Sequence, residues 1–413
     1  MFMLLIPLGL LVGIDLYFFQ ILKTVLGESS DRLRFTVYAI YWLVSITMIL
    51  LVFLSADRST FPVHIRYYIF SVLLLVLIPK LLGSLFLVGE DLFRLGEGVI
   101  GLFKPEDESF LQSRRRFIST AGLVASTLPF ATMLYGMVRT GFNIRIREVK
   151  AAFPDLPAGF DGLKIIQISD LHSGSFSSNS FFEEAVSRIN ELKPDLVFFT
   201  GDLVNNEAVE AERFVSTFKK LDARLGVYSI LGNHDYGDYG PWSSKEEKQE
   251  NLERLKQIHH DSGWNLLTND GAVIKSGNEE LAIVGVENWG AARHFPKHGD
   301  LDKAVEAVKD APFKILLSHD PSHWDAQVQN HDEKFQLTLS GHTHGAQFGI
   351  EIPGFKWSPV QYVYKQWAGL YEGTNGQKLY VNRGLGFIGY MGRIGIPPEI
   401  TVLELNSSEN SLT

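Results

Sequence analysis

Lys164–His172 has the sequence KIIQISDLH, in which a short apolar run leads into an aspartate, a leucine and a histidine. A run of this length that is rich in isoleucine is typical of a buried strand. Side chains at positions i and i+2 of an extended chain point the same way. The stretch therefore predicts a strand whose end directs two candidate metal ligands, Asp170 and His172, to one side.

Four further apolar runs lead into polar motifs. They are Leu196–Thr200 before Gly201-Asp202, Val227–Leu231 before Gly232-Asn233-His234-Asp235, Phe313–Ser318 before His319-Asp320, and Gln336–Ser340 before Gly341-His342-Thr343-His344-Gly345. Helix-like stretches at 180–192 and 207–221 separate the first three runs, which gives the βαβαβ order of a parallel sheet. Because parallel strands bring their carboxyl ends to one edge, we expect all five motifs to converge there.

The convergent side chains are imidazoles, carboxylates and one amide, a donor set that suits Mn²⁺, Fe or Zn²⁺ better than Ca²⁺. The chain contains no cysteine, which excludes thiolate nucleophiles and cysteine-bound zinc. The charged stretch 244–258 is interpreted as a solvent-exposed helix face. Four other histidines lack the strand-end setting and are interpreted as surface or loop residues: His259, His260, His294 and His298.

The average composition hides two differently built parts. The chain has 413 residues, of which 46% are hydrophobic and 21% charged, and its formal net charge is −9. Residues 1–140 contain 12 Lys and Arg against 10 Asp and Glu, whereas the remainder contains 26 against 37. The composition excludes a disordered chain, and the acidic second part argues against a nucleic-acid partner.

The first part is a predicted membrane region. It contains four apolar runs of about the 20 residues that span a bilayer, and we predict a transmembrane helix for each: 1–22, 35–55, 67–88 and 117–138. Pro79 and Lys80 interrupt the third run. Three further segments complete the predicted organisation, namely a linker with a first strand at 141–162, a folded domain at 163–405 and a disordered tail at 406–413.

Asp15 and Lys80 are the ionisable residues well inside these apolar runs. Charges within a membrane are costly and are usually paired or functional. If the first and third helices run parallel, the two charges lie at matching depth. We therefore hypothesise a structural ion pair between them, with separate extension of the two side chains toward the lipid headgroups as the alternative.

Basic loop residues set the predicted orientation in a plasma (inner) membrane. With the N-terminus outside, the basic residues after the first and third runs are cytoplasmic, which places the second part on the extracytoplasmic side. The basic residues after the last run, from Arg139 to Lys150, weaken this asymmetry. Ser113–Ile118 (SRRRFI) is similar to a twin-arginine export signal, and the alternative is a basic anchor of a stop-transfer helix.

The ordered motifs D-x-H, G-D, G-N-H-D, H-D and G-H-T-H resemble those of the calcineurin-like metallophosphoesterase superfamily, over most of the second part. Leu379–Gly386 (LYVNRGLG) and Arg393–Ile400 (RIGIPPEI) make the chain most similar to a membrane-anchored branch that includes the YkuE and YaeI phosphoesterases. The resemblance implies an α/β fold, in which a four-layer α/β/β/α sandwich follows the multi-span helical membrane region.

The resemblance also implies a dinuclear metal site. By motif position, one divalent ion takes Asp170, His172 and His344, the second takes Asn233, His319 and His342, and Asp202 bridges both. Two such ions clamp a phosphate and generate a hydroxide nucleophile. His234 is then placed to protonate the leaving oxygen, and Asp235 is expected to hold the tautomer of that imidazole.

We therefore predict a membrane-anchored phosphoesterase that cleaves phosphomono- or diester bonds by a metal-activated hydroxide. Manganese, zinc and iron stay open as the metal, and so does the oligomeric state. Membrane tethering favours a lipid-linked or envelope substrate. The alternatives are a pyrophosphate hydrolase of lipid A synthesis that acts on UDP-2,3-diacylglucosamine, which faces the cytoplasm, and a non-catalytic membrane sensor that uses the fold for binding.

Overall fold

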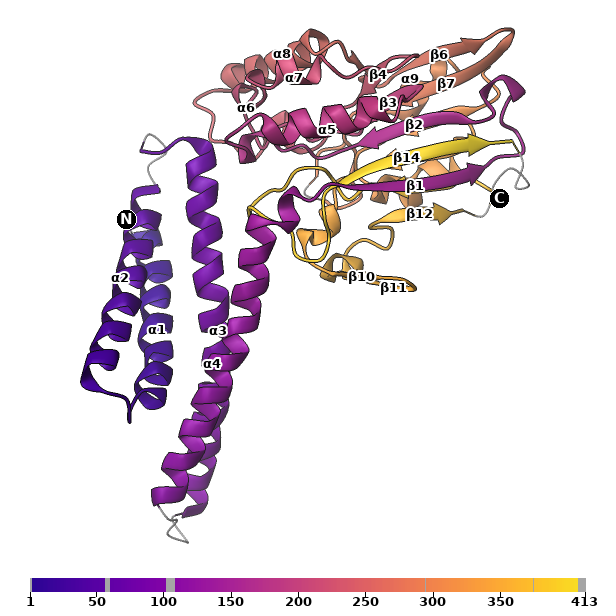
Figure 1. Cartoon of the computed structure of the whole chain (residues 1–413). Coiled ribbons are helices and arrows are strands. Elements are labelled where there is room, and N and C mark those ends of the chain that lie inside the picture. Colours follow the sequence, from indigo (N-terminus) through magenta and orange to yellow (C-terminus); the bar gives the residue numbers. More distant parts are fainter. Residues whose placement is uncertain (1, 56–59, 102–107, 294, 374, 408–413) are drawn as a thin grey trace. The chain divides into compact units, whose positions relative to one another are not determined.

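The computed structural model describes residues 2–55, 60–101, 108–293, 295–373 and 375–407. The chain divides into two compact units, and Figure 1 shows a helical unit and a unit built on sheets. The helical unit comprises Met1–Met137 with Gly389–Met391, and the other comprises Val138–Ile388 with Gly392–Thr413. The predicted tail at 406–413 lies outside the described residues from position 408 onward.

Four long helices make up most of the first unit: α1 (Phe2–Val25), α2 (Asp31–Ser55), α3 (Val63–Gly101) and α4 (Glu108–Val138). Each has a segment of mean hydropathy between 1.5 and 2.4 that is long enough to cross a membrane. Large apolar side chains are exposed along them, among them Phe35 at 75% and Leu128 at 69%, as suits helices solvated by lipid. The predicted multi-span helical membrane region is confirmed, and α3 continues through Pro79.

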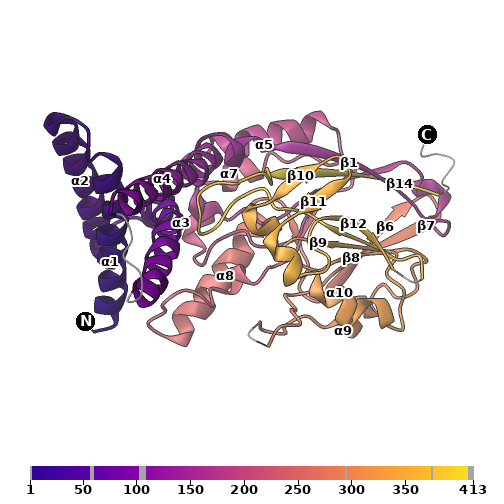
Figure 2. The ribbon, with the colours of Figure 1, turned by 90° about the horizontal axis from the view of Figure 1, so that it is seen from below.

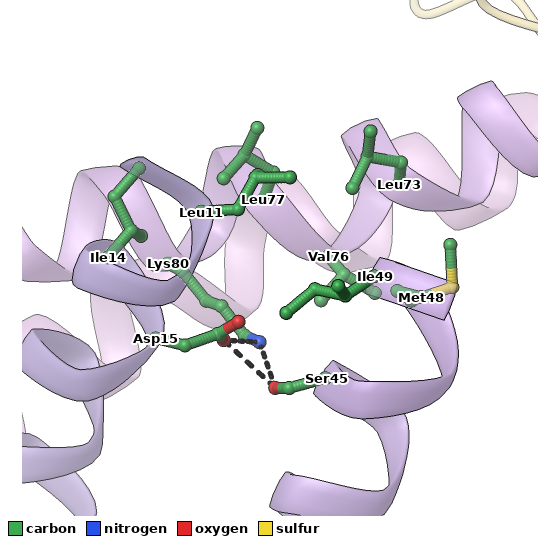
Figure 3. Close-up of a pocket in the computed structure, with 10 residues that line it drawn as sticks. All are labelled: Leu11, Ile14, Asp15, Ser45, Met48, Ile49, Leu73, Val76, Leu77 and Lys80. Carbon is green, nitrogen blue, oxygen red and sulfur yellow. Dashed lines mark hydrogen bonds and ion pairs between the residues drawn. The ribbon is translucent and has the colours of Figure 1, made fainter. Parts of the chain in front are cut away.

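Asp15 of α1, Ser45 of α2 and Lys80 of α3 form a buried polar cluster inside this unit (Figure 3). Lys80 Nζ is ion-paired with Asp15 Oδ1 and donates to Ser45 Oγ at 2.8 Å. Ser45 Oγ donates to Asp15 Oδ1 at 2.9 Å, and the Tyr41 hydroxyl donates to the Asp15 carbonyl at 2.8 Å. The hypothesis of an ion pair is confirmed, and the pair also has two hydroxyl partners from a third helix.

The basic run of α4 is held by acidic residues of α3. Arg115 Nη1 lies 2.9 Å from Asp91 Oδ1 and 3.3 Å from Glu90 Oε2, and Arg114 Nη2 lies 3.6 Å from Glu90 Oε1. The Glu90 side chain is fully buried, so it depends on these cations. The Tyr17 hydroxyl of α1 donates to Asp91 Oδ2 at 2.7 Å. The run that resembles an export signal thus has a structural contact that joins α1, α3 and α4.

Two six-stranded sheets form the core of the second unit. The first sheet has the order β1 (Arg145–Ala152), β14 (Glu399–Asn406), β2 (Leu163–Ile168), β3 (Leu196–Phe199), β4 (Val227–Ser229) and β5 (Asn265–Leu266). In this sheet β2, β3, β4 and β5 are parallel, as predicted for the strands before the first three motifs.

The second sheet has the order β12 (Gly369–Glu372), β13 (Lys378–Val381), β9 (Leu337–Ser340), β8 (Lys314–Leu317), β7 (Glu279–Gly285) and β6 (Asp270–Ser276). Its central strands β13, β9, β8 and β7 are parallel, which aligns the carboxyl ends of β8 and β9. A separate antiparallel hairpin consists of β10 (Ile350–Ile352) and β11 (Phe355–Trp357).

The two sheets share one apolar core. Ile165 and Phe198 of the first sheet and Ile283, Ile315 and Leu339 of the second belong to the same cluster, and all five are fully buried. Full burial of one such side chain contributes about 1.5–3 kcal/mol relative to leaving it exposed. The packed sheets form the two inner layers of the predicted sandwich.

Helices cover the outer faces of both sheets, and Figures 1 and 2 show them from two directions. The first sheet carries α5 (Ser180–Glu191), α6 (Val209–Glu212), α7 (Val215–Phe218) and α8 (Lys245–Asp261), and the second carries α9 (Leu301–Glu306) and α10 (Ser322–Ala326). The helix expected at 207–221 is divided into α6 and α7, because Phe214 N–H bonds the carbonyl of Ala211 in a tighter turn. The four-layer α/β/β/α architecture is confirmed.

A buried carboxylate ties the two sheets together. Glu399 of β14 accepts from Arg383 Nη1 at 2.6 Å and from the Tyr380 hydroxyl of β13 at 2.7 Å, and Arg147 Nε of β1 lies 3.3 Å away. Burial by itself raises the pKa of Glu399, but the charges of Arg383 and Arg147 lower it further, so the pKa lies below its usual value. Glu399 is therefore ionised in the folded protein at neutral pH.

We expect Glu399→Gln to lower the free energy of unfolding by about 1.5–3 kcal/mol, because the buried Arg383 then loses one charged hydrogen bond and keeps only Glu351 as a carboxylate partner. The folded-state pKa lies below the unfolded value of about 4.3. The ion pairs therefore stabilise the fold above that pH, and this contribution disappears as the pH falls through the folded-state pKa. Denaturant unfolding in detergent, at neutral pH and below pH 4, measures both effects.

The matched control for that variant is Glu280→Gln, which removes an exposed pair with Lys275 and is expected to cost less than about 1 kcal/mol. An equal loss of unfolding free energy in the two variants would contradict a stabilising buried ion pair at Glu399. So would a difference between wild type and Glu399→Gln that stays constant at low pH.

A double-mutant cycle tests the intramembrane pair. We expect Asp15→Leu and Lys80→Leu each to destabilise the protein by about 3–5 kcal/mol, because each leaves an uncompensated buried charge. The double variant should be much closer to wild type, since no charge is left unpaired. Thermal unfolding in detergent micelles measures this, with Lys23→Leu at an exposed position as the control. Additive losses would show that the two side chains act independently.

Candidate metal centre

The polar motifs meet at the carboxyl ends of strands from both sheets. Asp170 and His172 follow β2, Asp202 follows β3, and Asn233 follows β4, whereas His319 follows β8 and the pair His342 and His344 follows β9. The structure brings these side chains into two adjacent groups, Asp170 with His172 and His344, and Asp202 with His319 and His342. Within each group the nearest ligand atoms lie within 4.8 Å of one another.

In the first group, His344 Nε2 lies 3.2 Å from Asp170 Oδ1 and 3.0 Å from His172 Nε2. The distance between the two imidazole nitrogens is that of a hydrogen bond, and both rings are buried. Three ligand atoms that converge in this way are arranged to share a cation.

In the second group, His319 Nε2 lies 3.2 Å from Asp202 Oδ2, and His342 Nδ1 lies 2.8 Å from Asn233 Oδ1. Asp202 Oδ2 is also 3.7 Å from His172 Nε2 of the first group. The carboxylate of Asp202 therefore lies between the two groups and can reach both.

The backbone at these residues is not extended. Asp170, His172, Asp202, His342 and His344 have φ angles of +53°, +45°, +61°, +70° and +49°, in the left-handed region that side chains other than glycine rarely adopt. The expectation that i and i+2 side chains align on an extended chain is therefore wrong. The strands end at Ile168 and Ser340, before the motifs begin. Such strained backbone is typical of functional sites.

Two glycines allow the turns to pack this closely. A Cβ atom at Gly341 would lie 2.3 Å from Asp170 Oδ2, and one at Gly232 would lie 2.2 Å from Asp202 Oδ1. Both distances are too short for real atoms. Any other residue at these positions would displace a carboxylate of the site.

The donor set and its tautomers fit a metal ion. His319 Nδ1 donates to the carbonyl of Thr200 at 2.7 Å, which fixes the ring and leaves Nε2 for a ligand. His172 is fully buried, and burial together with the charge of His344 holds the pKa of its imidazole well below the usual range. His172 is therefore neutral, which is the form that binds metals.

Lowered pKa values keep the two ligand carboxylates, Asp170 and Asp202, ionised. Burial by itself raises the pKa of Asp170, but the charge of His344 and its hydrogen bond lower it further, so the pKa is below its usual range. For the imidazole of His319 burial acts in the opposite direction and lowers the pKa. The charge of Asp202 outweighs this effect and raises the pKa of His319 to about 10. The site thus attracts positive charge strongly, and divalent ions displace protons from sites of this kind.

His234 has a different orienting partner from the one expected. Its Nδ1 donates to the backbone carbonyl of Asn205 at 2.8 Å. The carboxylate of Asp235 instead accepts backbone N–H groups, from Asp202 at 2.9 Å, Leu203 at 2.8 Å and Gly232 at 2.8 Å. The prediction that Asp235 holds the tautomer of His234 is wrong, because both of its oxygens are used to fix the turns after β3 and β4.

Three residues near the site were not found from the sequence. The Tyr364 hydroxyl lies 2.8 Å from His342 Nε2, and Asn233 Nδ2 donates to the Tyr239 hydroxyl at 3.0 Å. Arg393 is fully buried, and its Nη2 lies 3.3 Å from His344 Nδ1. Both tyrosines lie in loops without a recognisable motif, whereas Arg393 opens the RIGIPPEI stretch and could have been found there.

Four histidines were expected to lie outside the site, and the three of them that the structure describes are not part of the two groups. His260 and His298 are exposed, as expected. His259 is fully buried, and its Nδ1 lies 2.9 Å from Ser229 Oγ, so the prediction of a surface residue is wrong there. His259 belongs to the inward face of α8 and packs against Trp264. His294 lies outside the described residues.

Two family models match the chain. The model described as "Probable Calcineurin-like phosphoesterase, transmembrane domain" matches residues 1–141, and the model described as "Calcineurin-like phosphoesterase" matches residues 163–346. The second match contains every residue of the two groups.

Curated relatives resemble the chain over 61–71% of its length. The metallophosphoesterase YkuE of Bacillus subtilis is 32% identical over 61% of this chain and 82% of its own length. The phosphodiesterase YaeI of Escherichia coli is 29% identical over 71% of this chain and 99% of its own length. A "transmembrane protein with metallophosphoesterase domain" of Danio rerio is 28% identical over 67% of this chain, which spans 60% of that relative. The chain belongs to the calcineurin-like metallophosphoesterase family, as a membrane-associated member.

Proposed function

We propose that seven side chains at this edge of the two sheets bind two divalent metal ions. The first ion would be held by Asp170, His172 and His344, the second would be held by Asn233, His319 and His342, and Asp202 would serve both. The observation that carries the proposal is the position of Asp202 Oδ2, 3.7 Å from His172 Nε2 and 3.2 Å from His319 Nε2. Imidazole and carboxylate donors suit manganese, iron or zinc.

The reaction proposed is hydrolysis of a phosphomono- or diester. Two ions held at this site would supply Lewis-acid activation of the phosphoryl group and of the attacking water. His234 supplies the proton that the leaving oxygen takes up. Its Nδ1 is bonded to the Asn205 carbonyl, so the proton is held and exchanged at Nε2. The ring of His234 lies 5.0 Å from that of His172, which keeps this donor next to the ligands.

The substrate is proposed to lie near the membrane, as a lipid-linked or envelope phosphoester on the extracytoplasmic side. The distribution of basic residues around the apolar runs supports this orientation. The opposite orientation would favour a cytoplasmic-facing substrate such as UDP-2,3-diacylglucosamine, whose pyrophosphate is the alternative target.

We expect the full chain in detergent to hydrolyse bis-p-nitrophenyl phosphate when Mn²⁺ is added, and chelation of the metal to abolish turnover. His234→Ala should keep its metal content and lose about 10²–10⁴-fold in kcat, the usual contribution of a general acid. Metal analysis and steady-state kinetics measure the two quantities. His260→Ala, at an exposed position outside the two groups, is the control.

The same measurements separate the possible errors. Loss of metal from His234→Ala would make that residue a ligand and not a proton donor. Full turnover in His234→Ala would remove it from the reaction altogether.

Reporter fusions test the proposed orientation. A fusion at the C-terminus should be active as an extracytoplasmic reporter, and a fusion after Gly27, between α1 and α2, should report the cytoplasm. Protection of the C-terminal fusion inside the cell would reverse the orientation and support the nucleotide-linked alternative.

A further inference from the structure

Glu210, in the short helix α6, is a buried carboxylate to which no role has so far been assigned. It is 8% exposed, and in the described part of the chain no basic side chain forms an ion pair with it. Burial raises the pKa of its carboxyl to about 7, although hydrogen bonds from backbone N–H groups lower it. Burying a carboxylate without a charged partner costs free energy, and hydrogen bonds to the backbone have to compensate for it.

The hydrogen bonds of Glu210 lead to the proton donor. Its Oε2 accepts the backbone N–H of Asn205 at 2.6 Å, and its Oε1 accepts that of Glu207 at 3.3 Å. The carbonyl of the same Asn205 accepts from His234 Nδ1 at 2.8 Å. The position of that carbonyl, which orients the imidazole, therefore depends on the carboxylate of Glu210.

Asn205 is held on its other sides as well. It is fully buried, and its Nδ2 donates to Ser175 Oγ at 3.2 Å. A Cβ atom at Gly174 would lie 2.2 Å from Glu210 Oε2 and 2.9 Å from Asn205 Nδ2, so the loop after His172 is closely fitted to both residues. The arrangement leaves Asn205 little freedom to move while its N–H is bonded to Glu210.

We propose that Glu210 is a positioning residue for the reaction: through Asn205 it fixes the orientation and the tautomer of His234. This inference rests on the proposed role of His234 as the proton donor. In Glu210→Gln one acceptor oxygen becomes an NH₂ group, which cannot accept an N–H, so the Asn205 segment loses part of its support. Loss of outer partners of this kind typically costs about 10–100-fold in activity, and small misplacements of a reacting group have effects of that size.

The test uses the full chain in detergent with Mn²⁺ and two diester substrates, one with a p-nitrophenyl and one with a phenyl leaving group. Phenolate is the poorer leaving group, so it depends more on a proton donor. We expect Glu210→Gln to keep its metal content and to lower kcat about 10–100-fold for the phenyl substrate, with a clearly smaller loss for the p-nitrophenyl substrate. Glu212→Gln is the matched control and should match wild type, because Glu212 lies on the same helix as Glu210 but is half-buried and pairs with Arg254 of α8.

A double-mutant cycle with His234→Ala distinguishes positioning from general damage to the fold. If Glu210 acts through His234, adding Glu210→Gln to His234→Ala should cause no further loss of kcat. The same loss in both backgrounds, or a loss that does not depend on the leaving group, would overturn the inference and leave the role of His234 intact. Full turnover in His234→Ala would instead overturn the proposed proton donor itself.

A conservative variant covers the case in which Glu210→Gln does not fold. Glu210→Asp keeps the charge and two acceptor oxygens on a shorter side chain, so it should recover the fold and lie between wild type and His234→Ala for the phenyl substrate. If Glu210→Asp lowers kcat by the same factor for the phenyl and the p-nitrophenyl substrate, the role of Glu210 is purely structural.

Discussion

Asp202 is the side chain on which both halves of the site depend. Its Oδ2 lies near His172, from the first sheet, and near His319, from the second, while its Oδ1 accepts the backbone N–H of His234 at 2.8 Å. Its backbone carbonyl accepts the N–H of His172 at 3.1 Å. A carboxylate that is fully buried must be compensated by donors or positive charge. The two sheets therefore have to keep their carboxyl ends together, and the shared apolar core between them makes this possible.

Much of this arrangement follows from the sequence, because buried parallel strands have a strong apolar signal and their ends meet at one edge. The convergence of the five motifs could be predicted for that reason. The backbone conformation could not, since an apolar run does not reveal the residue at which a strand ends. Asp170 and His172 therefore appeared to continue the strand, although both lie beyond it in left-handed conformations. The burial of His259 was missed because a charged helix has only a weak apolar face.

In the membrane unit, the sequence predicts the ion pair between Asp15 and Lys80 but not the other residues that contact it. Asp15 and Lys80 stand out because charges in an apolar run are costly, and their matching depth indicated the pair. Ser45 and Tyr41 complete the cluster, but a serine or a tyrosine in such a helix costs little and gives no comparable signal. Polar contacts of this kind fix the register of helices that apolar packing alone would leave less specific.

The partner of His234 determines how charge is shared in the site. The carboxylate of Asp235 is occupied by backbone N–H groups, whereas the carbonyl of Asn205 is neutral and orients the ring without adding negative charge. Burial by itself raises the pKa of Asp202, but the charges of His319 and His234 lower it further, so Asp202 is the carboxylate that carries negative charge beside the imidazoles. On the proposed function, that same carboxylate would hold the metal ions. The Asn205 carbonyl carries no charge, so it can orient the imidazole of His234 without competing with Asp202 for those ions.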